Sequence, residues 1–262
     1  SMPISSNIHP TAIIHSEAKI SKNVKIGPYS IIGEYVEIGD GTVVGNHVTI
    51  TGHTSIGQDN KIFHYCSLGE SPQDKKYNNE PTILKIGDRN TIREFCMFNP
   101  GTVQDKKITT IGNDNWIMAY VHIAHDCAIG NNIILANNTS IAGHVKVDDY
   151  AILGGLSGVH QYCQVGSHSI VAAGSIVFQD IPPFIMVAGY SAKPNGINIE
   201  GLKRREFSPE EISVIKKGYK VIYRDGNSLE DATAILKTMV ADSSSINLYL
   251  DFIKSSKRGI VR

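Results

Sequence analysis

Residues 20–45 read ISKNVKIGPYSIIGEYVEIGDGTVVG. In this stretch an Ile or a Val recurs at every sixth position, and a Gly usually follows it. The same spacing extends outward from Ile8 to Leu68, and it returns from Ile111 to Val177. A period of six matches neither an α-helix, at 3.6 residues per turn, nor a plain strand, whose side chains alternate with period two. It is typical of a hexapeptide β-helix.

The repeat predicts the cross-section of this β-helix. Each hexapeptide supplies a short strand and a corner, with its aliphatic side chain pointing inward, and three hexapeptides close one triangular coil of 18 residues. Successive coils then stack as parallel strands about 4.8 Å apart. The composition agrees, because the chain holds 37 Ile but only 7 Phe and 1 Trp. The predicted fold class is therefore mainly β.

Two segments interrupt the period and are predicted to leave the coil as loops. Residues 70–82 are polar and carry a Pro near each end. Residues 99–110 lie between two aliphatic or aromatic positions of the repeat, Phe98 and Ile111, and make their spacing one residue longer than two hexapeptides. A short run of the repeat, Ile86, Ile92 and Phe98, lies between them. Loops on a rigid scaffold often carry function.

The repeat stops at Ile181, and a small α-helical domain is predicted to follow. Ser208-Pro209-Glu210-Glu211 is a capping box with Pro at the first helical position, which predicts a helix as far as about Arg224. A second helix is predicted to begin at Ser228 and a third near Ser244 or Ser245. The predicted domains are residues 1–191, a β-helix, and residues 192–262, a helical domain.

Charge and composition exclude several classes of protein. Lys and Arg number 25 and Asp and Glu number 25, so the chain lacks the basic excess of a protein that coats nucleic acid. No apolar run approaches the roughly 18 residues that span a bilayer. Residues 1–5 lack the features of a signal peptide. The four Cys include no CxxC pair, which indicates reduced thiols and a cytoplasmic location.

The 18-residue coil also predicts which polar residues meet. Residues 18 apart stack on one another, so His125, Gly143 and Gln161 share one column of the second run. Asp126 and His144 share the neighbouring column. His160 precedes Gln161, and His122 lies on the same coil as His125. The pattern gathers four imidazoles and one carboxylate on successive coils.

This cluster suits general-base chemistry, because a neutral His beside a carboxylate accepts protons near pH 7. Asp126 is positioned to fix the tautomer of His125, and the backbone N–H of Gly143 is a candidate oxyanion donor. A zinc site is the main chemical alternative, since neutral imidazoles are common zinc ligands. No tight pair of His residues with a third ligand emerges from the spacing, so we expect no metal and no cofactor.

Five motifs carry a resemblance to a known family. They are HIAHDC at 122–127, LANN at 135–138, AGHV at 142–145, VHQ at 159–161 and NIEGLKRR at 198–205. Together they resemble the acyl-[acyl-carrier-protein]–UDP-N-acetylglucosamine O-acyltransferases, which begin lipid A synthesis in Gram-negative bacteria. The resemblance implies a left-handed β-helix and a homotrimer with active sites between subunits. It also implies transfer of an (R)-3-hydroxyacyl chain from acyl carrier protein to the 3-hydroxyl of UDP-N-acetylglucosamine.

The resemblance also implies roles for individual residues. His125 is the general base, Asp126 orients it, and the Gly143 amide holds the oxyanion. Further positions implied to bind substrate are His122, His144, His160 and Gln161 in the cleft; Gln73, Asp74 and Lys76 in the first loop; Asn198, Glu200, Arg204 and Arg205 at the nucleotide end; and Ala173, which is linked to acyl-chain length. The chain departs from the family where Asn99-Pro100 replaces a common His-Arg pair and where Ser191 replaces a frequent His.

Three alternatives use the same repeat. The N-acyltransferase of the same pathway carries a uridine-binding domain before its repeat, and here the repeat already begins at Ile8. An acetyl- or succinyltransferase that uses coenzyme A is disfavoured by the match at Lys203-Arg204-Arg205. A structural β-solenoid displays flat ranks of Thr, which this sequence lacks.

Overall fold

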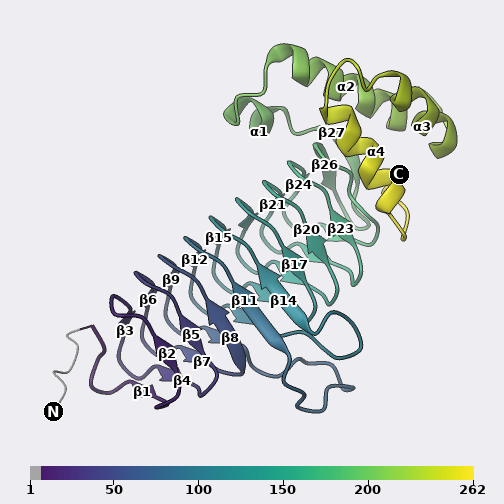
Figure 1. Cartoon of the computed structure of the whole chain (residues 1–262). Helices are drawn as coiled ribbons and strands as arrows, with labels where there is room; N and C mark the ends of the chain where they lie inside the picture. The colour runs from purple at the N-terminus through teal and green to yellow at the C-terminus, as the bar shows by residue number, and fades with distance from the viewer. Residues whose placement is uncertain (1–6) are drawn as a thin grey trace.

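A computed structural model describes residues 7–262 as a triangular stack of coils with helices at its C-terminal end (Figure 1). The predicted absence of a signal peptide rests partly on residues 1–6, which lie outside the described residues. None of the helices between residues 7 and 262 combines the length and the apolar composition that crossing a membrane requires.

Three sheets form the sides of the stack, and the chain visits them in the order sheet I, sheet II, sheet III. Sheet I contains β1 (Ile13–Ile14), β4 (Ile31–Ile32), β7 (Thr49–Ile50), β10 (Ser67–Leu68), β13 (Met97–Phe98), β16 (His122–Ile123), β19 (Ser140–Ile141), β22 (Gly158–Val159) and β25 (Ile176–Val177). Sheet II contains β2 (Lys19–Ile20), β5 (Glu37–Ile38), β8 (His53–Ile56), β11 (Ile83–Ile86), β14 (Ile108–Ile111), β17 (Ala128–Ile129), β20 (Lys146–Val147) and β23 (Gln164–Val165). Sheet III contains β3 (Lys25–Ile26), β6 (Val43–Val44), β9 (Lys61–Ile62), β12 (Thr91–Ile92), β15 (Trp116–Ile117), β18 (Ile134–Leu135), β21 (Ile152–Leu153), β24 (Ile170–Val171), β26 (Ile185–Ala188) and β27 (Lys193–Ile197).

The register confirms the 18-residue coil. Ile14 pairs with Ile32, and Ile123 pairs with Ile141, in parallel strands. In nearly every two-residue strand the second residue is the aliphatic of the repeat, and from Ile26 onward it is buried. The core is therefore a column of Ile, Val and Leu that runs the length of the stack.

Both predicted loops leave the stack, although the second is shorter than predicted. The first connects β10 to β11 through residues 69–82, and the second connects β13 to β14 through residues 99–107. β14 begins at Ile108 because a four-residue strand pairs there with β11, from Ile83↔Ile108 to Ile86↔Ile111. Residues 108–110, which we predicted to lie in the loop, therefore belong to sheet II.

The C-terminal end differs from the prediction in two places. The coil does not stop at Ile181, since β26 adds a further parallel strand beside β24, and β27 returns antiparallel to β26. A short helix that the sequence analysis missed, α1 (Ile199–Arg204), begins at an Asn198 cap. The three predicted helices are confirmed as α2 (Pro209–Tyr223), α3 (Leu229–Thr238) and α4 (Ser245–Ser255). The domain boundary at 191/192 remains a prediction.

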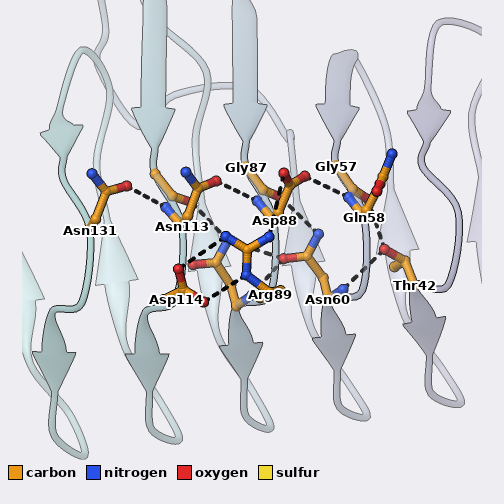
Figure 2. Close-up of polar contacts among 12 residues, drawn as sticks. Thr42, Gly57, Gln58, Asn60, Gly87, Asp88, Arg89, Asn113, Asp114 and Asn131 are labelled. Carbon is orange, nitrogen blue, oxygen red and sulfur yellow. Dashed lines mark hydrogen bonds and ion pairs between the residues drawn. The ribbon is translucent and has the colours of Figure 1, made fainter.

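The three corners of the prism differ in the kind of side chain that they carry. The corner between sheets II and III, here called the asparagine corner, contains a buried amide ladder through Asn60, Asn90 and Asn115. Figure 2 shows this corner, with Asn60 labelled. Asn90 Nδ2 donates to Asn60 Oδ1 at 3.0 Å, and Asn90 Oδ1 accepts from the Asn115 N–H at 3.0 Å. Asn90 Nδ2 also donates to the carbonyl of Gly112 at 2.8 Å. The ladder joins consecutive coils by side-chain bonds in addition to the strand pairing.

We predict that Asn90→Ala lowers the free energy of unfolding by about 1–3 kcal/mol, because it leaves the buried N–H of Asn115 without its acceptor and removes the side-chain donor to Asn60 Oδ1 and the Gly112 carbonyl. Urea denaturation followed by circular dichroism measures the change. Asn78→Ala is the control, since the Asn78 side chain is exposed and makes no hydrogen bond within residues 7–262. Equal midpoints for the two variants would show that the ladder does not stabilise the stack.

Candidate active site

His125 and Asp126 form a hydrogen-bonded pair at the corner between sheets I and II, here called the catalytic corner. The distance from His125 Nδ1 to Asp126 Oδ2 is 2.9 Å. Adjacent side chains of a strand point to opposite faces, but Asp126 has a φ of 61° in the left-handed region that Asp tolerates. The turn therefore brings the two neighbouring side chains together, as the predicted tautomer control requires.

Asp126 is fully buried and is held by the second loop. The Thr102 N–H donates to Oδ1 at 2.9 Å, and the Thr102 hydroxyl donates to Oδ2 at 2.6 Å. Burial alone would raise the pKa of Asp126, but the hydrogen bonds from His125 and Thr102 outweigh it and lower that pKa below its usual range. Asp126 is thus a carboxylate held in place by Thr102, and it accepts a hydrogen bond from His125.

Gly143 lies directly against the His125 ring. A Cβ added at Gly143 would stand 2.6 Å from His125 Cε1 and 2.8 Å from Nε2, closer than real Cβ contacts allow. The N–H of Gly143 donates to no acceptor within residues 7–262. A glycine at this position therefore leaves room for the imidazole and offers an unpaired donor beside it.

His144 connects this pair to the second loop. Its Nδ1 lies 2.5 Å from Asp105 Oδ2 and 3.8 Å from Asp126 Oδ2. Its ring meets that of His125 edge to face at 4.9 Å and stacks on Tyr162 at 4.2 Å. Two carboxylates and two imidazoles therefore form one connected cluster.

The sequence analysis missed Thr102 and Asp105. The 18-residue arithmetic places only residues of the coil, and both belong to a loop whose path the repeat does not determine. Thr102 follows directly after the Asn99-Pro100 departure and Gly101, and the repeat gives no signal for it. It gives none for Asp105 either.

The first loop brings Asp74 and Gln73 to the same corner. Asp74 Oδ2 lies 3.9 Å from His125 Nε2. Gln73 Nε2 lies 3.9 Å from the sulfur of Met97, whose carbonyl is 3.1 Å from Nδ1 of His122. Burial lowers the pKa of His122, and the nearby His125 lowers it further. Lys76, also predicted to bind substrate, has an exposed side chain with no carboxylate partner within residues 7–262.

His160 and Gln161 lie two coils beyond His125 and one beyond His144, as predicted. Both are exposed, and the N–H of the next residue, Tyr162, donates to the Gly143 carbonyl at 3.1 Å. The ring of His160 lies 5.7 Å from that of Phe178. These two side chains therefore border the catalytic corner without contacting His125.

The predicted nucleotide end lies at the asparagine corner instead. Arg205 NH1 is 3.1 Å from Nδ1 of His168, and its NH2 donates to the Tyr150 carbonyl at 3.1 Å. Burial, followed by the charge of Arg205, lowers the pKa of His168 to about 4. Asn198 caps α1 and donates to the His168 carbonyl at 3.1 Å, while Glu200 and Arg204 are exposed on the same helix.

Ala173 is exposed at the third corner, between sheets III and I. Within one chain the structure therefore brings together His125, Asp126, Gly143, His144 and Asp74, with His122 and Gln73 beside them. It does not bring Ala173 or the residues of α1 to this cluster.

His125, Asp126 and His144 also offer ligand atoms within 4.8 Å of one another, which is compatible with a metal ion. However, both oxygens of Asp126 already accept hydrogen bonds from Thr102, and one of them also accepts from His125. Both oxygens of Asp126 are thus already engaged by donors of the protein itself. That no metal takes part remains a prediction, which activity after chelation tests.

Comparisons with known proteins agree with this architecture. Residues 180–261 match the family model described as UDP-N-acetylglucosamine O-acyltransferase, domain 2, and residues 17–52 and 108–143 match the bacterial transferase hexapeptide model. The chain is 60% identical over 255 residues to the acyl-[acyl-carrier-protein]–UDP-N-acetylglucosamine O-acyltransferase of Thiobacillus denitrificans, covering 97% of this chain and 99% of that one.

Two solved structures have the same fold. The LpxA structure from Acinetobacter baumannii superposes with a TM-score of 0.96 at 44% identity, covering 98% of this chain and 100% of the other. The UDP-N-acetylglucosamine acyltransferase of Francisella novicida gives a TM-score of 0.95 at 45% identity, covering 97% and 94% of the two chains. The predicted fold class, a left-handed parallel β-helix followed by a small helical region, is confirmed. On the strength of its full-length relatives, this chain belongs to the acyl-[acyl-carrier-protein]–UDP-N-acetylglucosamine O-acyltransferase family.

Proposed function

We propose that this protein transfers an (R)-3-hydroxyacyl chain from acyl carrier protein to the 3-hydroxyl of UDP-N-acetylglucosamine, in the cytoplasm, as the first step of lipid A synthesis. The observation that carries the proposal is the His125–Asp126 pair with the unpaired Gly143 N–H beside it. The names of full-length relatives support both substrates.

The geometry supports a path for each proton in this reaction. His125 Nδ1 donates to Asp126, so Nε2 carries the free lone pair and takes the proton of the sugar hydroxyl. The hydroxyl oxygen then attacks the thioester carbon, and the Gly143 N–H stabilises the resulting oxyanion. Collapse of this intermediate forms the ester and expels the carrier thiolate, which receives the proton from Nε2. The buried Asp126 carboxylate stabilises the imidazolium between these steps.

The proposal also requires a homotrimer, because the candidate residues lie on different corners of one chain. In a triangular prism, a threefold axis beside the corner between sheets III and I places sheet I of one chain against sheet III of the next. The catalytic corner of one chain then meets the asparagine corner of its neighbour. Arg205 of that neighbour thereby approaches His125.

The corner at the proposed axis carries an exposed aromatic ladder. Its members are Tyr29, His47, Tyr65, Phe95 and Tyr120, with ring centroids 4.8–5.1 Å apart. Tyr29, Tyr65, Phe95 and Tyr120 are each at least 45% exposed in the single chain. A continuous apolar stripe of this kind is typical of a surface that a partner covers.

We predict that His125→Ala lowers turnover by about 10²–10⁴-fold while the unfolding transition stays in place. Release of the carrier thiol in the presence of UDP-N-acetylglucosamine measures the rate. His15→Ala is the control, because His15 occupies the same corner several coils away. If the variant retained more than about a tenth of wild-type turnover, the general base would be a different residue.

Gly143→Ala is predicted to reduce kcat by roughly 10²-fold, because the added Cβ displaces the His125 ring from its position. The KM for the nucleotide sugar should change little, since the residues predicted to bind its nucleotide end lie at the asparagine corner, away from Gly143. Gly155→Ala is the matched control, as a Cβ there meets no atom closer than 3.4 Å. Similar kcat values for the two variants would show that the His125 ring does not need a glycine at position 143.

Mixing two impaired variants tests the shared site. His125→Ala and Arg205→Ala chains, unfolded and refolded together, should recover about a quarter of wild-type activity, because about a quarter of the clefts combine an intact His125 with an intact Arg205. Each variant refolded alone provides the baseline. If trimers shown to contain both chains recovered no activity, His125 and Arg205 would not act together across a subunit boundary.

A further inference from the structure

A basic pocket of about 670 Å³ opens beside the catalytic corner, on the side of sheet II. Three segments that are distant in the sequence line it: the second loop, the outer faces of β20 and β23, and the residues that follow α4. Its cationic side chains are Lys106, Lys146, Lys257 and Arg258.

The positive charge of this pocket is largely unpaired. Lys106, Lys257 and Arg258 make no ion pair with a carboxylate anywhere in residues 7–262, and Lys146 reaches Asp148 at 3.6 Å. The one carboxylate in the lining, Asp105, is bound to His144. The pocket therefore has several cations free to bind an anion.

The pocket is continuous with the candidate active site, because His144 and Asp105 line both. Tyr162 forms part of its wall, stacked on His144, with the guanidinium of Arg258 over its ring at 5.9 Å from the centroid. The residues predicted for the nucleotide end, in contrast, lie at the asparagine corner. An anion held in this pocket would thus be anchored on the same chain as the general base.

We propose that this pocket binds the phosphate ester of a substrate, a step that rests on the proposed function. Several converging ammonium groups and one guanidinium fork are the donors that phosphate recognition uses. Two substrates bring phosphate to the reaction: the acyl donor, in its phosphopantetheine arm, and the nucleotide sugar, in its diphosphate. The position at the catalytic corner favours the acyl donor.

The first measurement needs no turnover. Inorganic pyrophosphate is titrated calorimetrically into the wild type and into the triple variant Lys106→Gln, Lys257→Gln, Arg258→Gln. We expect the triple variant to lose one pyrophosphate site per chain, or to bind it at least tenfold more weakly. The control Lys22→Gln, Lys25→Gln, Lys61→Gln removes the same charge from the N-terminal half of the stack and should bind as the wild type does. Equal binding by all three proteins would overturn the proposal.

Steady-state kinetics then identify the source of the phosphate. A rise in KM for the acyl carrier protein substrate of at least fivefold, with an unchanged KM for UDP-N-acetylglucosamine, assigns the pocket to the donor arm. The reverse pattern assigns it to the nucleotide diphosphate. Unchanged KM values for both substrates would show that no substrate phosphate binds there. A third outcome separates the two proposals. If the triple variant loses pyrophosphate binding but the wild type shows no acyl transfer, the anion site is supported and the proposed function is refuted.

Discussion

The structure depends on the vertical register of its coils. Backbone hydrogen bonds run between parallel strands, so a residue can pair only with the residue one coil away, and from β1 to β25 this offset is 18 where no loop intervenes. The aliphatic of each hexapeptide then always points inward, and the core is continuous. Any slip of one residue would turn an Ile outward and a polar side chain inward, which is why the register is strongly determined.

This register makes the corners a set of columns in which side chains of successive coils touch. Many corner residues have positive φ, including Asp126, His144 and Tyr162 on the catalytic corner. Non-glycine residues adopt this conformation at a cost, yet the pairing of strands on both sides holds them in it. The same turn that closes the triangle therefore places a carboxylate beside an imidazole and one imidazole above another.

The repeat explains how much of the molecule could be predicted. It gave the strands, the 18-residue coil and the column of His125 and Gly143, because these follow from periodicity alone. It could not give Thr102 or Asp105, since a loop returns to the stack by a path that no period encodes. The extra strand β26 was missed because Pro182 and Pro183 interrupt the pattern while strand pairing resumes after them. α1 was missed because six residues are too few for a helical period to emerge.

The distribution of side chains over three corners explains why one rigid prism can serve a reaction with two large substrates. A single β-helix has flat sides and no deep cleft, so residues on different corners cannot converge on one small molecule. In the homotrimer that we propose, association around the corner that carries the aromatic ladder would convert two flat sides into the walls of a cleft and would bring the asparagine corner of one chain to the catalytic corner of the next. The two loops then act locally: the first carries Asp74 to His125, and the second fixes Asp126 through Thr102 and adds Lys106 to the basic pocket. In the proposed enzyme the stack thus supplies distance and rigidity, while the loops and the C-terminal segment supply the charges that receive the donor.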